Sequence, residues 1–337
     1  MPNNKPPAFF NKLNHFIDAI PQLEPKDSSK RSININSANQ KTITHLKNYL
    51  DFYNIDFING CDADKNIAST HKIWQSQIFG YRIIEQCWQA KSPNGKTLFI
   101  VHGYFEHTGL YKNIIFWSLK HGYKVHLFDL PGHGLSSGKA ADIDSFTTYS
   151  NILTSIIRRE NAPTYSLIGQ STGGAIIINA LLSNVNTEQK IIPENIILLS
   201  PLVRSLHWQQ LRWFVYLMHR FTTSIKRYFP MSSHNKNFNE FLEHNDPLQA
   251  RRIPLSWLGA MNDWNKQIKT HAQNTEQPCW LIQGTDDKTV DYKYNIVAIK
   301  RCLPQIQVEL INGAAHNLIN ESDEYWQQVA AKLSTVL

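Results

Sequence analysis

The chain has 337 residues, a net charge of +7 and a pI of about 9.1, and 42% of its residues are hydrophobic. This length suits one α/β domain with an insertion, and the apolar content is enough for a large core. No stretch reaches the roughly 18–20 uninterrupted apolar residues that a membrane span needs. Residues 1–26 contain no apolar run followed by a small-residue cleavage site, which argues against a secretory signal peptide.

The cysteines and the charge distribution narrow the class of protein further. Cys61, Cys87, Cys279 and Cys302 show neither CxxC pairing nor metal-ligand spacing. We therefore expect reduced structural thiols, no metal site and a cytoplasmic protein. The positive charge is concentrated in residues 201–275, which contain ten Lys or Arg and four Asp or Glu, a net +6.

The N-terminal part, residues 1–70, is rich in Asn, Lys, Ser and Pro. It predicts an extension that is flexible up to about Ser32 and contains one short helix around Thr42–Phe52. Next along the chain, Ile73–Phe79 and Tyr81–Gln89 interleave polar and apolar residues and predict two antiparallel edge strands.

From residue 97 onwards, short apolar runs alternate with helical segments. The runs predict strands buried on both faces of a sheet, at 97–101, 124–128, 165–168, 195–199, 279–282 and 307–311. Helices are predicted at about 110–121, 145–160, 173–183, 292–302 and 322–336. This alternation predicts an α/β fold with a mostly parallel central sheet flanked by helices. The core is expected at 71–200 and 276–337, and the aromatic segment between them, 201–275, is expected to form a helical cap.

The first chemical signal follows the predicted strand at 165–168. Gly169-Gln170-Ser171-Thr172-Gly173 is a G-x-S-x-G pattern between a strand and a helix, the context in which it holds a nucleophilic serine. Gly169 and Gly173 let the strand and the helix approach closely, and the helix N-terminus favours negative charge beside Ser171. The same letters also occur in plain glycine-rich turns, but the strand–turn–helix context favours catalysis.

A second loop, His102-Gly103-Tyr104-Phe105-Glu106-His107, directly follows the predicted strand at 97–101. In the fold that carries the serine motif, this loop supplies one backbone N–H of an oxyanion hole, and the residue after the serine supplies the other. The prediction assigns these donors to Tyr104 and Thr172, and losing one such donor typically costs about 10²–10³ in rate. The alternative is that His102 and His107 only satisfy loop carbonyls, and for His102 this is compatible with the prediction, because the proposed function belongs to the backbone.

Two further loops contain a candidate acid and a candidate base. Asp286 and Asp287 follow the predicted strand at 279–282, and His316 follows the last predicted strand. A serine hydroxyl needs a base to remove its proton, and the base needs a carboxylate to orient it. The chain order serine, acid, histidine is typical of this motif class. We choose Asp287 as the acid and keep Asp286 as the alternative; no sequence pattern predicts a metal or a cofactor.

In these residues the chain resembles the α/β-hydrolase superfamily, in particular its lysophospholipase and monoacylglycerol lipase branch (serine aminopeptidase S33-type hydrolases). The resemblance covers about residues 73–200 and 276–337. It rests on H-G-x-x-E-H-x-x-x-Y at residues 102–111, D-x-x-G-H-G-x-S at 129–136, G-x-x-D at 284–287 and G-A-x-H at 313–316. It implies the α/β-hydrolase fold and a triad of Ser171, Asp287 and His316, and it is the main reason to prefer Asp287 over Asp286.

Two departures from the family pattern concern the substrate rather than the mechanism. Tyr104 and Phe105 are bulky where small residues usually follow the His-Gly pair, so we expect a narrowed acyl pocket. Gln170 and Thr172 flank Ser171, where the family often has His and Met. Thr172 would contribute only its backbone to the oxyanion hole.

The cap segment opens with an aromatic stretch at residues 207–221. Leu211, Phe214, Val215, Met218 and Phe221 recur at helical spacing and predict a lid helix whose apolar stripe faces the active-site cleft. The same stretch is basic, which favours peripheral contact with an anionic membrane as a further role. No recognised nucleic-acid-binding module accompanies the charge.

Together these features predict a serine carboxylic-ester hydrolase that releases a fatty acid from a single-chain lipid through an acyl-enzyme on Ser171. The basic cap favours a lysophospholipid, with a monoacylglycerol as the second choice. A small-ester, thioester or peptide hydrolase, or an acyltransferase, on the same triad is an alternative, as is a non-catalytic ligand-binding member of the fold. The sequence points to no particular protein partner.

Overall fold

The computed structural model describes residues 10, 13–22, 33–34, 40–58, 66–183, 191–270 and 277–337. Its centre is a nine-stranded sheet of order β1-β2-β3-β5-β4-β6-β7-β10-β11. The strands are β1 (Ile33–Asn34), β2 (Ala68–Ile78), β3 (Tyr81–Ala90), β4 (Thr97–Val101), β5 (Lys124–Phe128), β6 (Tyr165–Gln170), β7 (Ile196–Leu199), β10 (Cys279–Gly284) and β11 (Gln307–Ile311). From β5 to β11 all neighbours are parallel, while β1, β2 and β3 add an antiparallel edge. The predicted fold class is confirmed.

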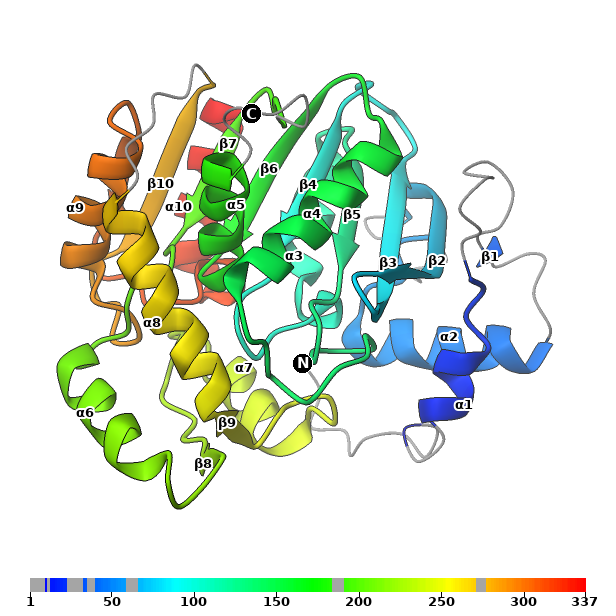
Figure 1. Cartoon of the computed structure of the whole chain (residues 1–337). Coiled ribbons are helices and arrows are strands. Elements are labelled where there is room, and N and C mark those ends of the chain that lie inside the picture. The colour runs from blue at the N-terminus through cyan, green and yellow to red at the C-terminus, as the bar shows by residue number, and fades with distance from the viewer. Residues whose placement is uncertain are drawn as a thin grey trace.

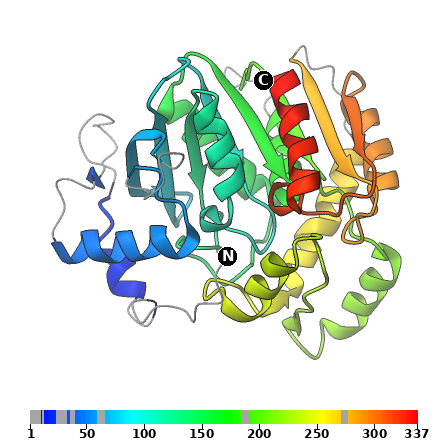
Figure 2. The same cartoon turned by 180° about the vertical axis from the view of Figure 1, so that it is seen from behind.

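Helices cover both faces of this sheet, and each face has its own apolar core (Figures 1 and 2). One face is covered by α4 (Phe146–Glu160), α5 (Thr172–Ser183) and α9 (Tyr292–Cys302). The other is covered by α3 (Lys112–Lys120) and α10 (Asp323–Val336). The central strands β4 and β7 are buried along their whole length, which explains why they are uniformly apolar in the sequence.

The chain leaves the sheet after β7 and returns at β10, and the segment between forms a cap beside the edge where the parallel strands end (Figure 1). Its elements are α6 (Trp208–Met218), β8 (Ser224–Lys226), α7 (Lys236–Glu240), β9 (Arg252–Pro254) and α8 (Leu255–Thr270). The antiparallel pair of β8 and β9 was not predicted, because each strand has only three residues and the pairing depends on the folded cap. Among the described helices, none has the length and apolar composition to span a bilayer.

The N-terminal segment packs against the core through α1 (Leu13–Asp18) and α2 (Gln40–Tyr53). The helix α2 covers the helix expected around Thr42–Phe52, and Leu46, Tyr49, Leu50 and Tyr53 are buried at helical spacing on one of its faces. Flexibility was expected up to Ser32. In that segment the structure describes only Phe10 and residues 13–22, so the prediction for the other residues lies outside the described part. Cys61 also lies outside it. Cys87, Cys279 and Cys302 are buried free thiols.

Candidate active site

Ser171 lies in the sharp turn between β6 and α5. Its φ of 52° is in the left-handed region, which costs a non-glycine residue about 1–2 kcal/mol. The turn is held because the Ser171 N–H donates to the Leu199 carbonyl at 2.8 Å. A Cβ at Gly169 would lie 2.5 Å from the carbonyl carbon of Gly173, and a Cβ at Gly173 would lie 2.0 Å from the Val101 carbonyl oxygen. Only glycine therefore fits at both positions, which places the serine at the carboxyl edge of the sheet.

A continuous hydrogen-bonded chain joins Ser171, His316 and Asp287, and all three are buried. The distance from Ser171 Oγ to His316 Nε2 is 3.0 Å, and that from His316 Nδ1 to Asp287 Oδ2 is 2.8 Å. Since the carboxylate can only accept, Nδ1 carries the proton and Nε2 is left to accept from the serine hydroxyl. The structure thus brings together three residues from loops that lie far apart in the sequence.

The Asp287 carboxylate is fixed by further donors. Its Oδ1 accepts from the backbone N–H groups of Thr289 and Val290 at 2.9 and 3.0 Å, and its Oδ2 accepts from the Gln283 side chain at 2.9 Å. The neighbouring Asp286 points away: its side chain is 42% exposed and pairs with Lys288. Asp287, and not the alternative Asp286, contacts the imidazole.

Burial and charge set the protonation of this chain in opposite directions. Burial lowers the pKa of His316, but the Asp287 carboxylate and its hydrogen bond outweigh burial, so the pKa is raised above its ordinary value. Burial also raises the pKa of Asp287, yet His316 and the surrounding donors bring that pKa below its ordinary value. An imidazole that is stabilised as its cation beside an ionised carboxylate is suited to accept a proton.

The loop after β4 lies beside the serine, and its conformation is fixed by buried polar groups. His102 Nε2 accepts from the Leu130 N–H at 2.9 Å, so its Nδ1 donates to the Gly103 carbonyl at 2.8 Å. Burial lowers the pKa of His102 to about 3, which keeps the ring neutral. The Tyr104 N–H has no acceptor among the described residues, and the N–H of Thr172, the first residue of α5, has none within the helix. These are the donors predicted for an oxyanion hole.

Glu106 ties this loop to the loop that contains His316. Its carboxylate accepts from the Gly103 N–H at 2.7 Å and from the hydroxyl of Tyr111, and it also accepts from the side chain of Asn317. Burial raises the pKa of Glu106. Tyr111 belongs to the family pattern, whereas the sequence offered no signal for Asn317 beyond its position next to His316.

His107 makes a contact that the sequence analysis missed. Its Nε2 lies 3.0 Å from the Asp246 carboxylate of the cap, and the Tyr53 hydroxyl of α2 donates to the same carboxylate at 2.8 Å. Burial lowers the pKa of His107, but Asp246 outweighs burial and the pKa is raised. The N-terminal segment, the cap and the loop after β4 therefore meet at one buried ion pair.

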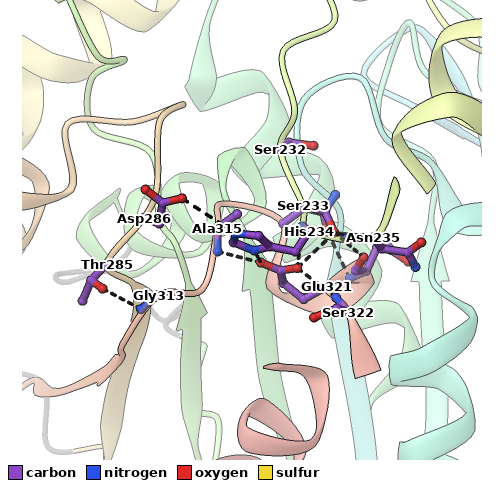
Figure 3. A network of polar contacts seen from close by, with 12 residues as sticks. Ser232, Ser233, His234, Asn235, Thr285, Asp286, Gly313, Ala315, Glu321 and Ser322 are labelled. Carbon is purple, nitrogen blue, oxygen red and sulfur yellow. Dashed lines mark hydrogen bonds and ion pairs between the residues drawn. The ribbon is translucent and has the colours of Figure 1, made fainter. Parts of the chain in front are cut away.

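A second polar network docks the cap onto the histidine loop (Figure 3). The buried Glu321 accepts from the Ala315 N–H at 2.6 Å, directly before His316. The same carboxylate accepts from the Ser233 hydroxyl and from the backbone and ring of His234. The other ring nitrogen of His234 lies 3.7 Å from Asp286. Asp286 is thus part of a cap contact rather than of the serine–histidine chain.

Ser171 opens into a cavity of about 260 Å³ between the sheet edge and the cap. Its apolar lining consists of Leu202, Leu211, Phe229, Pro230, Leu242, Ile253, Trp257, Leu258, Met261 and Val290. The bulky Tyr104 and Phe105 also line it, and the Tyr104 ring stacks on Trp257 at 3.6 Å. Within the described residues, no three His, Cys, Asp or Glu side chains are grouped so that they could hold a metal ion.

The first helix of the cap differs from its prediction. Leu211, Val215 and Met218 pack against the core as expected, but Phe214 is 44% exposed and Phe221, beyond the end of α6, is 81% exposed. The apolar stripe is narrower than predicted: the side of α6 that packs against α8 and the core is formed by Leu211, Val215 and Met218. The outer surface instead presents Trp213 and other aromatic residues beside basic ones.

Comparison with known proteins identifies the family of the chain. Residues 92–323 match the family described as serine aminopeptidase, S33. A monoglyceride lipase homolog of monkeypox virus is 25% identical over 258 residues, which are 74% of this chain and 91% of that protein. Phospholipase YtpA of Bacillus subtilis is 28% identical over 218 residues, 60% of this chain and 80% of that protein.

A solved structure supports the fold. A soluble variant of monoglyceride lipase from Saccharomyces cerevisiae, in complex with a substrate analog, has a TM-score of 0.67 at 18% identity and covers 78% of this chain and 94% of that chain. The family match spans more than half of the chain and includes the loops of Ser171, Asp287 and His316. The chain therefore belongs to the serine aminopeptidase S33 family, with the fold of the α/β-hydrolases.

Proposed function

We propose that this α/β-hydrolase is a carboxylic-ester hydrolase that releases a fatty acid from a single-chain lipid, a lysophospholipid or a monoacylglycerol. The observation that carries the proposal is the Ser171–His316–Asp287 chain, which opens into an apolar cavity under the cap. Relatives named as a monoglyceride lipase homolog and as a phospholipase support this substrate class.

The proposed mechanism follows from the geometry. His316 Nε2 removes the Ser171 proton as Oγ attacks the ester carbonyl, and Asp287 stabilises the imidazolium that forms. The N–H groups of Tyr104 and Thr172 bind the oxyanion. His316 then gives its proton to the departing alcohol. In the second half of the reaction His316 activates a water molecule that hydrolyses the acyl-enzyme.

A peptide substrate, which the name of the family suggests, fits the cavity less well than a lipid ester. An aminopeptidase needs a carboxylate to bind the positively charged amino terminus of its substrate. Glu106 is the one acidic residue in the described lining of the cavity, and Gly103, Tyr111 and Asn317 already donate to it. Thioesters and acyl transfer to an alcohol use the same acyl-enzyme, so they belong in the test panel.

Contact with an anionic membrane is a further part of the proposal. Arg212, Arg220 and Lys226 are exposed on the cap, close in sequence to the exposed aromatic residues Trp213 and Phe221. Basic residues next to amphipathic aromatic rings are typical of surfaces that lie in the membrane interface.

The test is fatty-acid release from a panel of monoacylglycerol, lysophosphatidylcholine, lysophosphatidylglycerol, an acyl-thioester, an aminoacyl-arylamide and a short nitrophenyl ester. Ser171→Ala is expected to abolish release while the protein stays folded, because alanine fits the same turn. Labelling by a fluorophosphonate in the wild type, and not in the variant, checks the nucleophile independently. Substantial release by Ser171→Ala would refute the proposed nucleophile, and absence of labelling in the wild type would favour a non-catalytic binding protein.

A further inference from the structure

Arg227 is a cation in the wall of the cavity that contains Ser171. It follows β8 directly, is half-buried, and belongs to the lining of the cavity. Its guanidinium stacks over the ring of Phe105 at 3.8 Å and over that of Phe229 at 4.1 Å. Phe105 adjoins Tyr104, whose N–H is a proposed oxyanion donor, and both residues line the same cavity as Arg227.

The guanidinium has no ion-pair partner among the described residues. Its Nη1 donates to the Gln249 side chain at 2.7 Å and to the Ala250 carbonyl at 3.2 Å, and both acceptors are neutral. No described residue accepts from its Nε or Nη2. A guanidinium has five N–H donors in a planar fork, so a large part of its capacity is unused.

The carboxylates nearest to Arg227 are already engaged. Asp246 accepts from Tyr53 and Gln249 and pairs with His107. Gln249 thus stands between this acid and Arg227. Burial lowers the pKa of Arg227 to about 10. The positive charge of Arg251, whose guanidinium lies over the Phe229 ring, also lowers this pKa. The carboxylates of Asp246 and Glu106 act on the pKa of Arg227 in the opposite direction, but neither forms an ion pair with it. The group is still charged at neutral pH, so a partly desolvated cation lines the cavity without a direct ion-pair partner among the described residues.

A half-buried cation is costly unless an anion pairs with it, and the planar fork of Arg matches the oxygens of a phosphate. We propose that Arg227 is a specificity-determining residue that binds the phosphate of a single-chain acyl-glycerol phosphate, with its acyl chain in the apolar part of the cavity and its ester at Ser171. The inference rests on the proposed function for the position of the ester. It separates the two lipid classes left open above in favour of the phosphate-bearing one.

Binding of ether analogues tests Arg227 without any ester chemistry. The ligands are 1-O-octyl-glycerol 3-phosphate and 1-O-octyl-glycerol, which differ only in the phosphate, and the readout is the ratio of their Kd values within each variant. Arg227→Met is expected to reduce the preference for the phosphate about 10- to 100-fold, because a hydrogen-bonded charged pair is lost. Arg227→Lys keeps the charge but lacks the planar fork, and its preference for the phosphate is expected to lie between that of the wild type and that of Arg227→Met. Arg252→Met removes a charge from β9, the strand that pairs with β8, but outside the described cavity lining. This variant is the matched control and is expected to keep the wild-type ratio.

The ratio remains informative if a variant is partly unfolded, because both ligands lose the same fraction of sites. Equal ratios in the wild type and in Arg227→Met would overturn the proposal, as would a wild type with no preference for the phosphate. Competition by free glycerol 3-phosphate at the concentration of the lipid would identify a small phosphoester as the ligand and overturn the lipid assignment. Hydrolysis of the matched octanoyl esters is followed in parallel: failure there, with the binding ratio intact, would count against the proposed function and not against the Arg227 site.

Discussion

At the scale of single residues, the proposed chemistry depends on the proton of one imidazole. His316 must be neutral to accept the proton of Ser171, yet its contact with Asp287 favours the cation. Burial alone would lower its pKa, and the carboxylate reverses the direction. The raised pKa narrows the pH range in which His316 is neutral. In return, the carboxylate stabilises the imidazolium that forms in the transition state.

Asp287→Asn tests this balance, with Asp286→Asn as the matched control. In the wild type, kcat/KM is expected to rise with pH through an ionisation above the ordinary histidine value of about 6.5. Asp287→Asn should lower kcat/KM by about 10⁴-fold and move that ionisation to lower pH, because the residue that raises the pKa of His316 is gone. Asp286→Asn should change neither quantity, since Asp286 contacts Lys288 and His234 instead. The measurement is the pH profile of kcat/KM on a short ester, and a larger loss in Asp286→Asn would reverse the assignment of the acid.

At the scale of elements, the parts around the cavity are held together by buried polar contacts. The His107–Asp246 pair joins the loop after β4 to the cap, and Tyr53 adds α2 to it. Glu321 joins the cap to the loop of His316 (Figure 3). Removing one partner of a buried ion pair leaves the other uncompensated, so such contacts strongly couple the elements that supply them.

Asp246→Asn is expected to lower the free energy of unfolding by about 3 kcal/mol at pH 5.5. Tyr53→Phe removes one hydrogen bond to a charged group and should cost about 1.5 kcal/mol. The raised pKa of His107 means that its contribution is present below the ordinary histidine pKa and lost as the pH rises through the raised value. The lowered pKa of Asp246 means that its contribution is present above the ordinary aspartate pKa and lost as the pH falls through the lowered value.

The difference in stability between the wild type and Asp246→Asn should therefore be largest between about pH 4 and 6.5. Urea unfolding at several pH values measures it. A difference that is the same at pH 5.5 and well above the raised pKa of His107 would show that the ion pair is not its source.

At the scale of the whole molecule, the excess positive charge is concentrated in the cap segment, which lines part of the cavity. Arg212, Arg220 and Lys226 are exposed, whereas Arg227 is part of the cavity lining. The basic surface and the basic pocket are therefore separate features that neighbour each other in the sequence, and they can be tested separately.

Arg212→Gln, Arg220→Gln and Lys226→Gln combined are expected to weaken binding to vesicles that contain anionic lipid about 100-fold at low salt, because each charge contributes about 1 kcal/mol near such a surface. Binding should also fall with ionic strength in the wild type. Hydrolysis of a soluble short-chain ester should be unchanged, since none of the three residues is in the described cavity lining. Vesicle co-sedimentation measures the binding. Equal binding by the variant and the wild type would contradict the membrane role and leave the cap only the role of covering the cavity.

Much of the fold was determined by the sequence on its own. The apolar runs at 97–101 and 124–128 coincide with β4 and β5, and the predicted helix at 292–302 coincides with α9. The run at 307–311 coincides with β11, but the prediction that this strand is buried on both faces is wrong: β11 lies at the edge of the sheet, and Gln307 and Leu310 are exposed. Strands β6 and β10 extend to Gln170 and Gly284, beyond the apolar runs, because their last residues still pair with β7 and β11. Burial on both faces imposes a continuous apolar pattern, which is local in the sequence and can therefore be read without the structure.

The candidate site was determined only in part by the sequence. The turn around Ser171 could be predicted, because Gly169 and Gly173 are required by close backbone contacts within one local motif. The choice of Asp287 over Asp286 rested on a resemblance, and the structure adds the contact with His316.

The partners of His107, the open guanidinium of Arg227 and the exposure of Phe214 and Phe221 were decided by the tertiary structure alone. Each depends on how the cap docks on the sheet, and that docking brings together residues more than a hundred positions apart in the sequence, such as His107 and Asp246. A local pattern reports which face of a helix or strand is apolar, but it contains no information on which distant side chain will lie against a given charge.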